Sequence, residues 1–282
     1  MTKGHKLLQK QISDFEKMLR REEKAAGTIE KYVRDVQAFA AWLKGRAVNR
    51  ELVSEWKETL ITAGYAPVTI NAALSALNKF FHFMCWGKCC VNFLRVQRRI
   101  FRDRSRELTK EEYVCLLETA HKQGRARLAL LLETICSTGI RVSEIHYITV
   151  EAAQRGQAEI VLKGKIRVIL LPGKLCRKLL KYARKQKIIS GEIFLTKSGK
   201  GLSRQQIWAE MKQLCQASGV EPSKVFPHNL RHLFAITFYR VCRDIVKLAD
   251  ILGHSSIETT RIYLVTTGAE HARQLDRLGL IC

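Results

Sequence analysis

The chain has 282 residues, of which 46% are apolar and 27% charged, a composition typical of a globular protein of about two domains. Its 49 lysines and arginines against 26 aspartates and glutamates give a formal net charge of +23. This surplus exceeds what solubility requires and indicates a polyanionic partner, most often nucleic acid. The sequence contains neither an apolar run long enough to span a membrane nor a basic amphipathic helix suited to lipid, so we expect no membrane partner.

The chain has nine cysteines, which is an odd number, and its N-terminal residues lack the apolar block of a secretion signal. We therefore expect a cytoplasmic protein without a disulfide framework. His82, Cys85, Cys89 and Cys90 are the one compact group with metal-ligating side chains. Because Cys89 and Cys90 are adjacent and no second pair accompanies them, we interpret them as packed thiols and expect no metal.

Residues 1–94 predict a domain made of helices only. The stretch 28–39 has apolar side chains at helical spacing, and we expect its helix to start after Gly27 with Thr28 as the N-cap. A shorter helix is predicted around Trp56, and another follows Pro67. We interpret the aromatic residues of these helices as core rather than as base-stacking surfaces. The apolar face of the helix after Pro67 consists of Ile70, Ala73, Leu74, Leu77, Phe80 and Phe81.

The segment 95–106 is rich in arginine and poor in apolar residues. Such a segment is typical of a solvated linker, and it also suits a linker that lies along phosphates, where each neutralised phosphate steepens the salt dependence of binding. We expect both at once. The predicted DNA-contacting residues are Arg95, Arg98, Arg99, Arg102, Arg104 and Arg106.

A second domain, mixed α and β, is predicted over residues 107–282. Thr109 and Glu112 form a capping box at its first helix, and a long apolar helix ends at Gly139. Residues 158–162 and 166–171 read as two strands of a β-hairpin around a basic turn. The predicted fold class is therefore mainly α with one small β-hairpin.

Polar residues without an obvious structural task recur in five segments of this second domain. Gly253 is a natural helix stop, and Ser255 with Glu258 can cap a new helix, so the break would let His254 and Tyr263 face one pocket. Tyr263 would then lie two turns into that new helix. The residues concerned are Arg141, Glu144, Lys163, Lys165, His228, Arg231, His254 and Tyr263.

These side chains suit a reaction in which a tyrosine oxygen attacks a phosphodiester and forms a phosphotyrosine ester. Two arginines, Arg141 and Arg231, can hold the non-bridging oxygens, because guanidinium groups are permanently charged planar donors. A base such as His228 can help to remove the proton of Tyr263, and a lysine on the hairpin can protonate the departing sugar oxygen. The phosphotyrosine ester conserves the energy of the broken bond, so we expect no cofactor. Each residue alone has an ordinary structural explanation, and the joint pattern carries the hypothesis.

The strings TGIRVSE, HNLRH and LGHSSIETTRIY closely resemble motifs of the tyrosine recombinases, also called phage integrases. The resemblance is to compact Xer-like and transposon or phage integrases. Glu144 and His232 match supporting positions of the family. The turn is one residue shorter than the usual GKGxK, so alignment selects Lys163 as the general acid while Lys165 stays open. The resemblance implies the catalytic set Arg141, Lys163, His228, Arg231, His254 and Tyr263.

The same resemblance implies how such an enzyme works. A core-binding domain and a catalytic domain would clamp double-stranded DNA, and cleavage would give a 3′-phosphotyrosyl bond. Four protomers would exchange strands between two duplexes through a Holliday junction, with the tail 264–282 docked on a neighbouring protomer. DNA-bending or directionality proteins are optional partners, and the location is bacterial-type and nucleoid-associated.

Two rival functions remain at this point. A type IB topoisomerase shares the chemistry but acts alone on one duplex, and a non-catalytic DNA-binding module could retain the fold. A complete residue set argues against the second rival, and the compact layout with its tail argues against the first. The sequence leaves the target site, and the choice between integration, excision, resolution and inversion, open.

Overall fold

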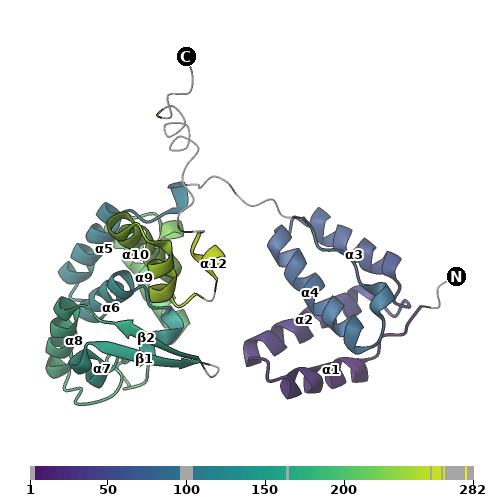
Figure 1. The fold of residues 1–282 in the computed structure, drawn as a ribbon, viewed down its shortest axis with the longest axis horizontal. Coiled ribbons are helices and arrows are strands. Elements are labelled where there is room, and N and C mark those ends of the chain that lie inside the picture. Colours follow the sequence, from purple (N-terminus) through teal and green to yellow (C-terminus); the bar gives the residue numbers. More distant parts are fainter. Residues whose placement is uncertain are drawn as a thin grey trace. The chain divides into compact units, whose positions relative to one another are not determined.

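The computed structural model describes residues 4–95, 104–162, 165–254, 256–261, 263 and 277. The chain divides into two compact units, Met1–Arg98 and Arg99–Cys282 (Figure 1). The described residues of each unit include a hydrophobic core of their own. The described part is mostly helical with one two-stranded antiparallel sheet, which confirms the predicted fold class. None of its helices is long and apolar enough to cross a lipid bilayer.

The first unit is a bundle of helices around an aromatic core. Phe15 and Phe80 pack edge to face with ring centroids 5.3 Å apart, and Phe39 packs against Phe81 at 6.1 Å. Phe39, Phe80 and Phe81 are therefore core, as their spacing predicts. Its elements are α1 (Gln9–Arg21), α2 (Ala26–Leu43), α3 (Arg50–Thr62), α4 (Pro67–Phe83) and a 3-10 turn at Gly87–Cys89.

The start of α2 differs from the sequence prediction. The helix begins at Ala26 with Ala25 as its N-cap, so Gly27 lies inside the first turn and Thr28 does not cap. The amide N–H groups of Thr28 and Ile29 both donate to the Ala25 carbonyl. Gly27 is tolerated because the first turn lies at the end of the helix, where a helix-breaking residue costs less. The helix predicted to follow Pro67 is α4, which begins at Pro67 itself.

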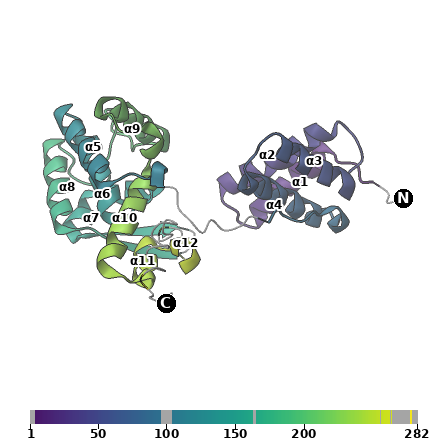
Figure 2. The same ribbon diagram turned by 90° about the horizontal axis from the view of Figure 1, so that it is seen from above.

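The second unit is built around α6, whose side chains are buried on nearly every face. It packs against α5, α8 and α10 (Figure 2). The predicted capping box is present, since the Thr109 hydroxyl accepts from the Glu112 amide at 3.2 Å. The helices are α5 (Lys110–Lys122), α6 (Ala126–Thr138), α7 (Val150–Arg155), α8 (Gly173–Lys185), α9 (Arg204–Ser218), α10 (Pro227–Cys242), α11 (Ile245–Leu252) and α12 (Ile257–Arg261), with 3-10 turns at Arg104–Arg106, Val142–Tyr147 and Pro222–Lys224.

The predicted hairpin is present as β1 (Gln157–Leu162) and β2 (Lys165–Leu170). The strands pair antiparallel, with Gln157 opposite Leu170 and Leu162 opposite Lys165, and the two residues between them lie outside the described part. Ile160 and Ile169 are buried. Because side chains alternate along a strand, Arg167 shares the inward face of β2 with Ile169.

Candidate active site

Arg141 is positioned by a sharp reversal of the chain at the end of α6. Gly139 closes that helix with φ +63°, and a β-carbon at this position would lie 2.5 Å from the Phe234 ring. Arg141 then precedes the 3-10 turn Val142–Tyr147 and is tied to Glu144 twice. Its backbone N–H donates to one carboxylate oxygen at 3.0 Å and its guanidinium to the other at 2.8 Å.

Glu144 is a buried carboxylate with two arginine partners. Its side chain is 1% exposed, whereas that of Arg141 is 40% exposed. Arg167 reaches the same carboxylate from β2, with an Nη1–Oε2 distance of 3.1 Å. Burying a carboxylate is costly unless it is paired and hydrogen-bonded, and Glu144 is both. The pairing leaves Arg141 free to present part of its guanidinium to an external anion.

Arg231 lies one turn after His228 on α10, which begins at Pro227, a residue favoured in the first turn of a helix. It is 3% exposed and donates to the Gly139 carbonyl, and at 2.7 Å to the Leu252 carbonyl. Burial and then the neighbouring Arg141 lower the pKa of Arg231, while contact with Tyr263 opposes that shift. An arginine pKa is so high that Arg231 stays charged at neutral pH.

His254 follows Gly253, which ends α11 with φ +61° as the sequence predicts. Its Nε2 lies 3.0 Å from Arg231 Nη2, and its Nδ1 lies 2.8 Å from the hydroxyl of the buried Thr260. A guanidinium can only donate, so Nε2 accepts and the ring proton resides on Nδ1. Burial, then Arg231 and Arg141, lower the pKa of His254 to about 4. The ring is therefore neutral at pH 7.

Tyr263 is 3% exposed and lies among three histidines. Its ring centroid is 5.2 Å from that of His232 and 5.9 Å from those of His228 and His254. Partial burial and Arg231 also lower the pKa of His228, one side of which stays open to solvent. The site thus collects three imidazoles, of which that of His254 is neutral at pH 7, and charged guanidiniums around one phenol. This arrangement is suited to stabilise an anion that forms next to the phenol.

The backbone at Tyr263 differs from the sequence prediction. α12 ends at Arg261 and Tyr263 lies in a turn, its N–H donating to the Thr260 carbonyl at 3.0 Å. The expectation that Tyr263 lies two turns into the helix is therefore wrong. A bond to the third preceding residue is tighter than an α-helical bond, and it turns the ring toward α10. Ser255, the predicted cap, lies outside the described residues, although the Ser256 hydroxyl accepts from the Glu258 amide.

Comparisons with known proteins match both units of the chain. Residues 106–269 match the family model described as phage integrase family, and residues 12–88 match that of the phage integrase N-terminal SAM-like domain. The chain belongs to the phage integrase family. As a tyrosine recombinase it is an enzyme that cleaves and rejoins DNA at specific sites, so neither a topoisomerase nor a non-catalytic module is favoured.

Curated relatives span nearly the whole integrase chain. It is 30% identical to tyrosine recombinase XerC of Roseiflexus castenholzii over 85% of this chain and 83% of the relative. It is 27% identical to tyrosine recombinase XerA of Pyrococcus furiosus over 96% and 94%. A solved lambda integrase tetramer bound to a Holliday junction aligns with TM-score 0.74 and 17% identity, over 93% and 78% of the two chains. The last likeness establishes the fold.

The described part of this integrase brings most of the predicted site residues together: Arg141, Glu144, His228, Arg231, His232, His254 and Tyr263. Lys163 lies outside it, and Lys165 is described only as backbone of β2. Among the predicted DNA contacts, Arg95 and Arg106 are exposed. Arg98, Arg99, Arg102 and the Arg104 side chain also fall outside the described part.

Two residues of the site were missed from the sequence, Arg167 and Thr260. A signal existed for Arg167, because it occupies the inward position of β2 in register with Ile169, where an apolar side chain is expected. Thr260 carried no such signal, since its role depends on how α12 packs against His254. The contact between Thr260 and His254 spans six residues across a helix break.

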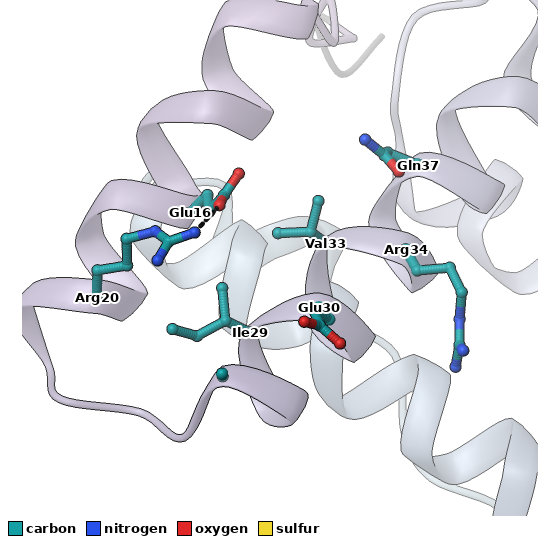
Figure 3. Close-up of a pocket in the computed structure, with 8 residues that line it drawn as sticks. Glu16, Arg20, Ile29, Glu30, Val33, Arg34 and Gln37 are labelled. Carbon is teal, nitrogen blue, oxygen red and sulfur yellow. Dashed lines mark hydrogen bonds and ion pairs between the residues drawn. The ribbon is translucent and has the colours of Figure 1, made fainter. Parts of the chain in front are cut away.

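A pocket of about 360 Å³ in the first unit is lined by none of the candidate active-site residues. It lies between α1 and α2 and is lined by residues of both charges, among them the exposed pair Glu16 and Arg20 (Figure 3). Its mixed charge does not favour an anion, and we assign it no part in the chemistry.

Proposed function

We propose that Tyr263 is the nucleophile with which this recombinase cleaves DNA. Its phenolic oxygen attacks the scissile phosphorus as the bond to the 5′-oxygen breaks, leaving a 3′-phosphotyrosyl ester and a free 5′-hydroxyl. A 5′-hydroxyl of the partner duplex then reverses this step and restores the tyrosine. The observation that carries the proposal is the packing of the Tyr263 ring beside His228 and His254, in contact with Arg231.

The difficulty of this step lies in the phenol. With an ordinary tyrosine pKa near 10, full deprotonation at pH 7 costs about 4 kcal/mol. His228 reduces this cost by accepting the proton, which its lowered pKa permits because the ring is neutral. Arg141 and Arg231 stabilise the charge on the non-bridging oxygens as phosphorus becomes five-coordinate. His254 supports this role by accepting from Arg231.

Lys163 is the proposed general acid that protonates the departing 5′-oxygen, with Lys165 as the alternative. Lys163→Ala should slow cleavage of an ordinary phosphodiester by about 100-fold or more, since general acid catalysis contributes 10²–10⁴-fold. A 5′-bridging phosphorothiolate has a leaving group that needs no proton, and the variant should cleave it at close to the wild-type rate. If Lys165→Ala gives this pattern and Lys163→Ala does not, the general acid is Lys165.

The rest of the chain serves DNA binding and assembly in this proposal. The helical unit 1–94 and the arginines of 95–106 hold double-stranded DNA, for which the charge of +23 is suited. Four copies act on two duplexes through a Holliday junction, with the tail 264–282 docked on a neighbour and with optional accessory proteins. The enzyme acts in the cytoplasm on the nucleoid, in integration, excision or resolution.

Covalent trapping on a nicked suicide duplex tests the nucleophile. Tyr263→Phe should reduce trapping at least 1000-fold, by order of magnitude for loss of a nucleophile, while duplex affinity stays within about twofold. Tyr239→Phe is the matched control, because Tyr239 packs in the same small apolar cluster as Tyr263. Trapping that persists in Tyr263→Phe and disappears in Tyr239→Phe would overturn the assignment. With two labelled duplexes, exchanged products distinguish recombination from simple relaxation.

A further inference from the structure

Three consecutive carbonyl groups at the end of α11 each accept a hydrogen bond from a different arginine. The Ile251 carbonyl accepts from Arg167 at 2.9 Å and the Leu252 carbonyl from Arg231 at 2.7 Å. The Gly253 carbonyl accepts from Arg141 at 3.4 Å. The last carbonyls of a helix lack partners within the helix and carry its negative dipole end, so they attract cations. The next residue in the chain is His254.

Of these three arginines, Arg167 is the one carried by the hairpin. Its guanidinium joins two groups that are far apart in sequence, the buried carboxylate of Glu144 and the Ile251 carbonyl. Its side chain is 13% exposed, compared with 40% for Arg141. Arg141 can therefore meet an external phosphate, whereas Arg167 is enclosed and can influence a phosphate only through its neighbours.

The backbone at Gly253 passes directly against this guanidinium. A β-carbon on Gly253 would lie 2.3 Å from Arg167 Cδ and 2.5 Å from its Nε. That Nε is buried and has no hydrogen-bond partner within the described residues. A buried unpaired N–H costs free energy, so Arg167 is held there against a penalty that an apolar side chain would avoid. This penalty favours a role beyond packing.

The electrostatic setting agrees with this interpretation. Burial, together with the charges of Arg231 and Arg141, lowers the pKa of Arg167 to about 10, while Glu144 opposes the shift. One carboxylate thus balances three guanidiniums, and without it Arg141 and Arg167 would repel each other. Arg167 in turn restrains Glu144 in the orientation that holds Arg141.

We propose that Arg167 is a positioning residue for phosphoryl transfer, which fixes Arg141 through Glu144 and fixes the backbone before His254 through the Ile251 carbonyl. The proposal rests on the proposed function and deepens it. It predicts a loss of phosphate stabilisation in the transition state without loss of DNA binding.

Single-turnover cleavage of a suicide duplex at saturating protein tests the proposal. Arg167→Met keeps the aliphatic volume and removes the hydrogen bonds to Glu144 and to the Ile251 carbonyl. It should slow cleavage about 100-fold, the usual scale for a catalytic group displaced by about 1 Å. The duplex Kd should change less than about threefold, since no phosphate contact is lost. Arg177→Met, on the exposed face of α8, is the matched control and should cleave at the wild-type rate.

Two modified substrates identify the group through which Arg167 acts. A methylphosphonate at the scissile position lacks one negative charge and depends less on Arg141, so the defect of Arg167→Met should shrink to about tenfold or less. A 5′-bridging phosphorothiolate should leave the defect unchanged. Equal defects on all three substrates would indicate a merely structural residue and overturn the proposal. Rescue by the phosphorothiolate would place Arg167 behind the general acid and also overturn it.

Arg167→Lys keeps the inference testable if the methionine variant fails to fold. An ammonium is a compact charge that can reach Glu144 or the Ile251 carbonyl but cannot span both as the planar fork does. We expect an intermediate defect with the same methylphosphonate rescue, and wild-type cleavage by Arg167→Lys would contradict the proposal. Covalent labelling of Tyr263 in the wild type distinguishes failure of this inference from failure of the proposed function. If Tyr263 is not labelled, the proposed function fails, independently of the result for the Arg167 variants.

Discussion

The two units of this recombinase differ in what they bury. Within the described residues, the fully buried side chains of the first unit are apolar. The second unit also buries polar and charged groups, namely Thr134, Thr138, Glu144, Asn229, Arg231 and Thr260. Burying such groups costs free energy unless each finds a partner, so a fold keeps them where chemistry requires them. Glu144, Arg231 and Thr260 all contact predicted site residues.

The two cores therefore differ in what they contribute: the first stabilises its unit, and the second also holds residues of the candidate site in place. The first unit is stabilised by aromatic packing and can change its surface without disturbing its interior. In the second unit the interior also contains residues of the candidate site, among them Glu144 and Arg231. Asn229, between His228 and Arg231, donates to the Arg106 carbonyl at 2.7 Å. Substitutions in the two cores should therefore have different consequences even when they remove similar stability.

Glu144→Ala should have the largest effect on stability. It leaves Arg167 buried without its carboxylate, and breaking one partner of a buried pair costs about 3–5 kcal/mol. The matched control is Glu16→Ala, which breaks the exposed pair with Arg20 in the first unit and should cost about 1 kcal/mol or less. Denaturant unfolding measures both. Similar losses for the two variants would mean that the buried site is not special.

Leu74→Ala should cost about 3 kcal/mol through the cavity left in the apolar core of the first unit. Hydrogen–deuterium exchange should rise in α1 to α4 and stay unchanged in α10 and α11, because this core contains no group of the site. Val68→Ala, on the exposed face of the same helix, should change neither. Increased exchange around His254 would contradict the division of tasks.

The smallest expected effect is a pH dependence of stability that belongs to the second unit. The pKa of His254 is about 4 in the folded chain and about 6.5 when unfolded. Between these values the unfolded chain binds a proton that the folded chain excludes, so the free energy of unfolding falls as the pH drops through this window. Above the window, the contribution of the neutral His254 to stability is fully present. Thermal unfolding between pH 7 and 4 should show a shallower loss in His254→Asn.

His121→Asn, at an exposed position of α5, is the control for this pH prediction. Its melting temperature should depend on pH as that of the wild type does. A His254→Asn profile identical to the wild type would show that His254 is not the group excluded from protonation. A steeper profile would contradict the sign of the pKa shift.

Local chemistry made much of this architecture predictable. Gly139 and Gly253 end their helices with positive φ, Thr109 and Glu112 cap α5, and Pro227 opens α10, each for a reason contained in a few neighbouring residues. The spacing of His228 and Arg231 on one helix follows in the same way. Most of the candidate site could therefore be proposed from short strings.

The remainder depends on contacts that no short string contains. Tyr263 lies beyond α12 because its ring packs against α10 and α11, and this tertiary packing overrides the helical pattern. Arg167 meets Ile251 across 84 residues, and neither side chain nor carbonyl signals that meeting in the sequence. The start of α2 at Ala26 was missed because a glycine near a helix end is less costly than in its middle.

Identification of the DNA-bearing peptide tests the central claim most directly. After reaction with a suicide duplex, trypsin digestion places Tyr263 in residues 262–273 and Tyr239 in residues 232–240. Mass spectrometry should find the nucleotide adduct on residues 262–273, at Tyr263. An adduct on residues 232–240, or cleavage with no adduct on any tyrosine, would contradict the assignment of Tyr263 as the nucleophile.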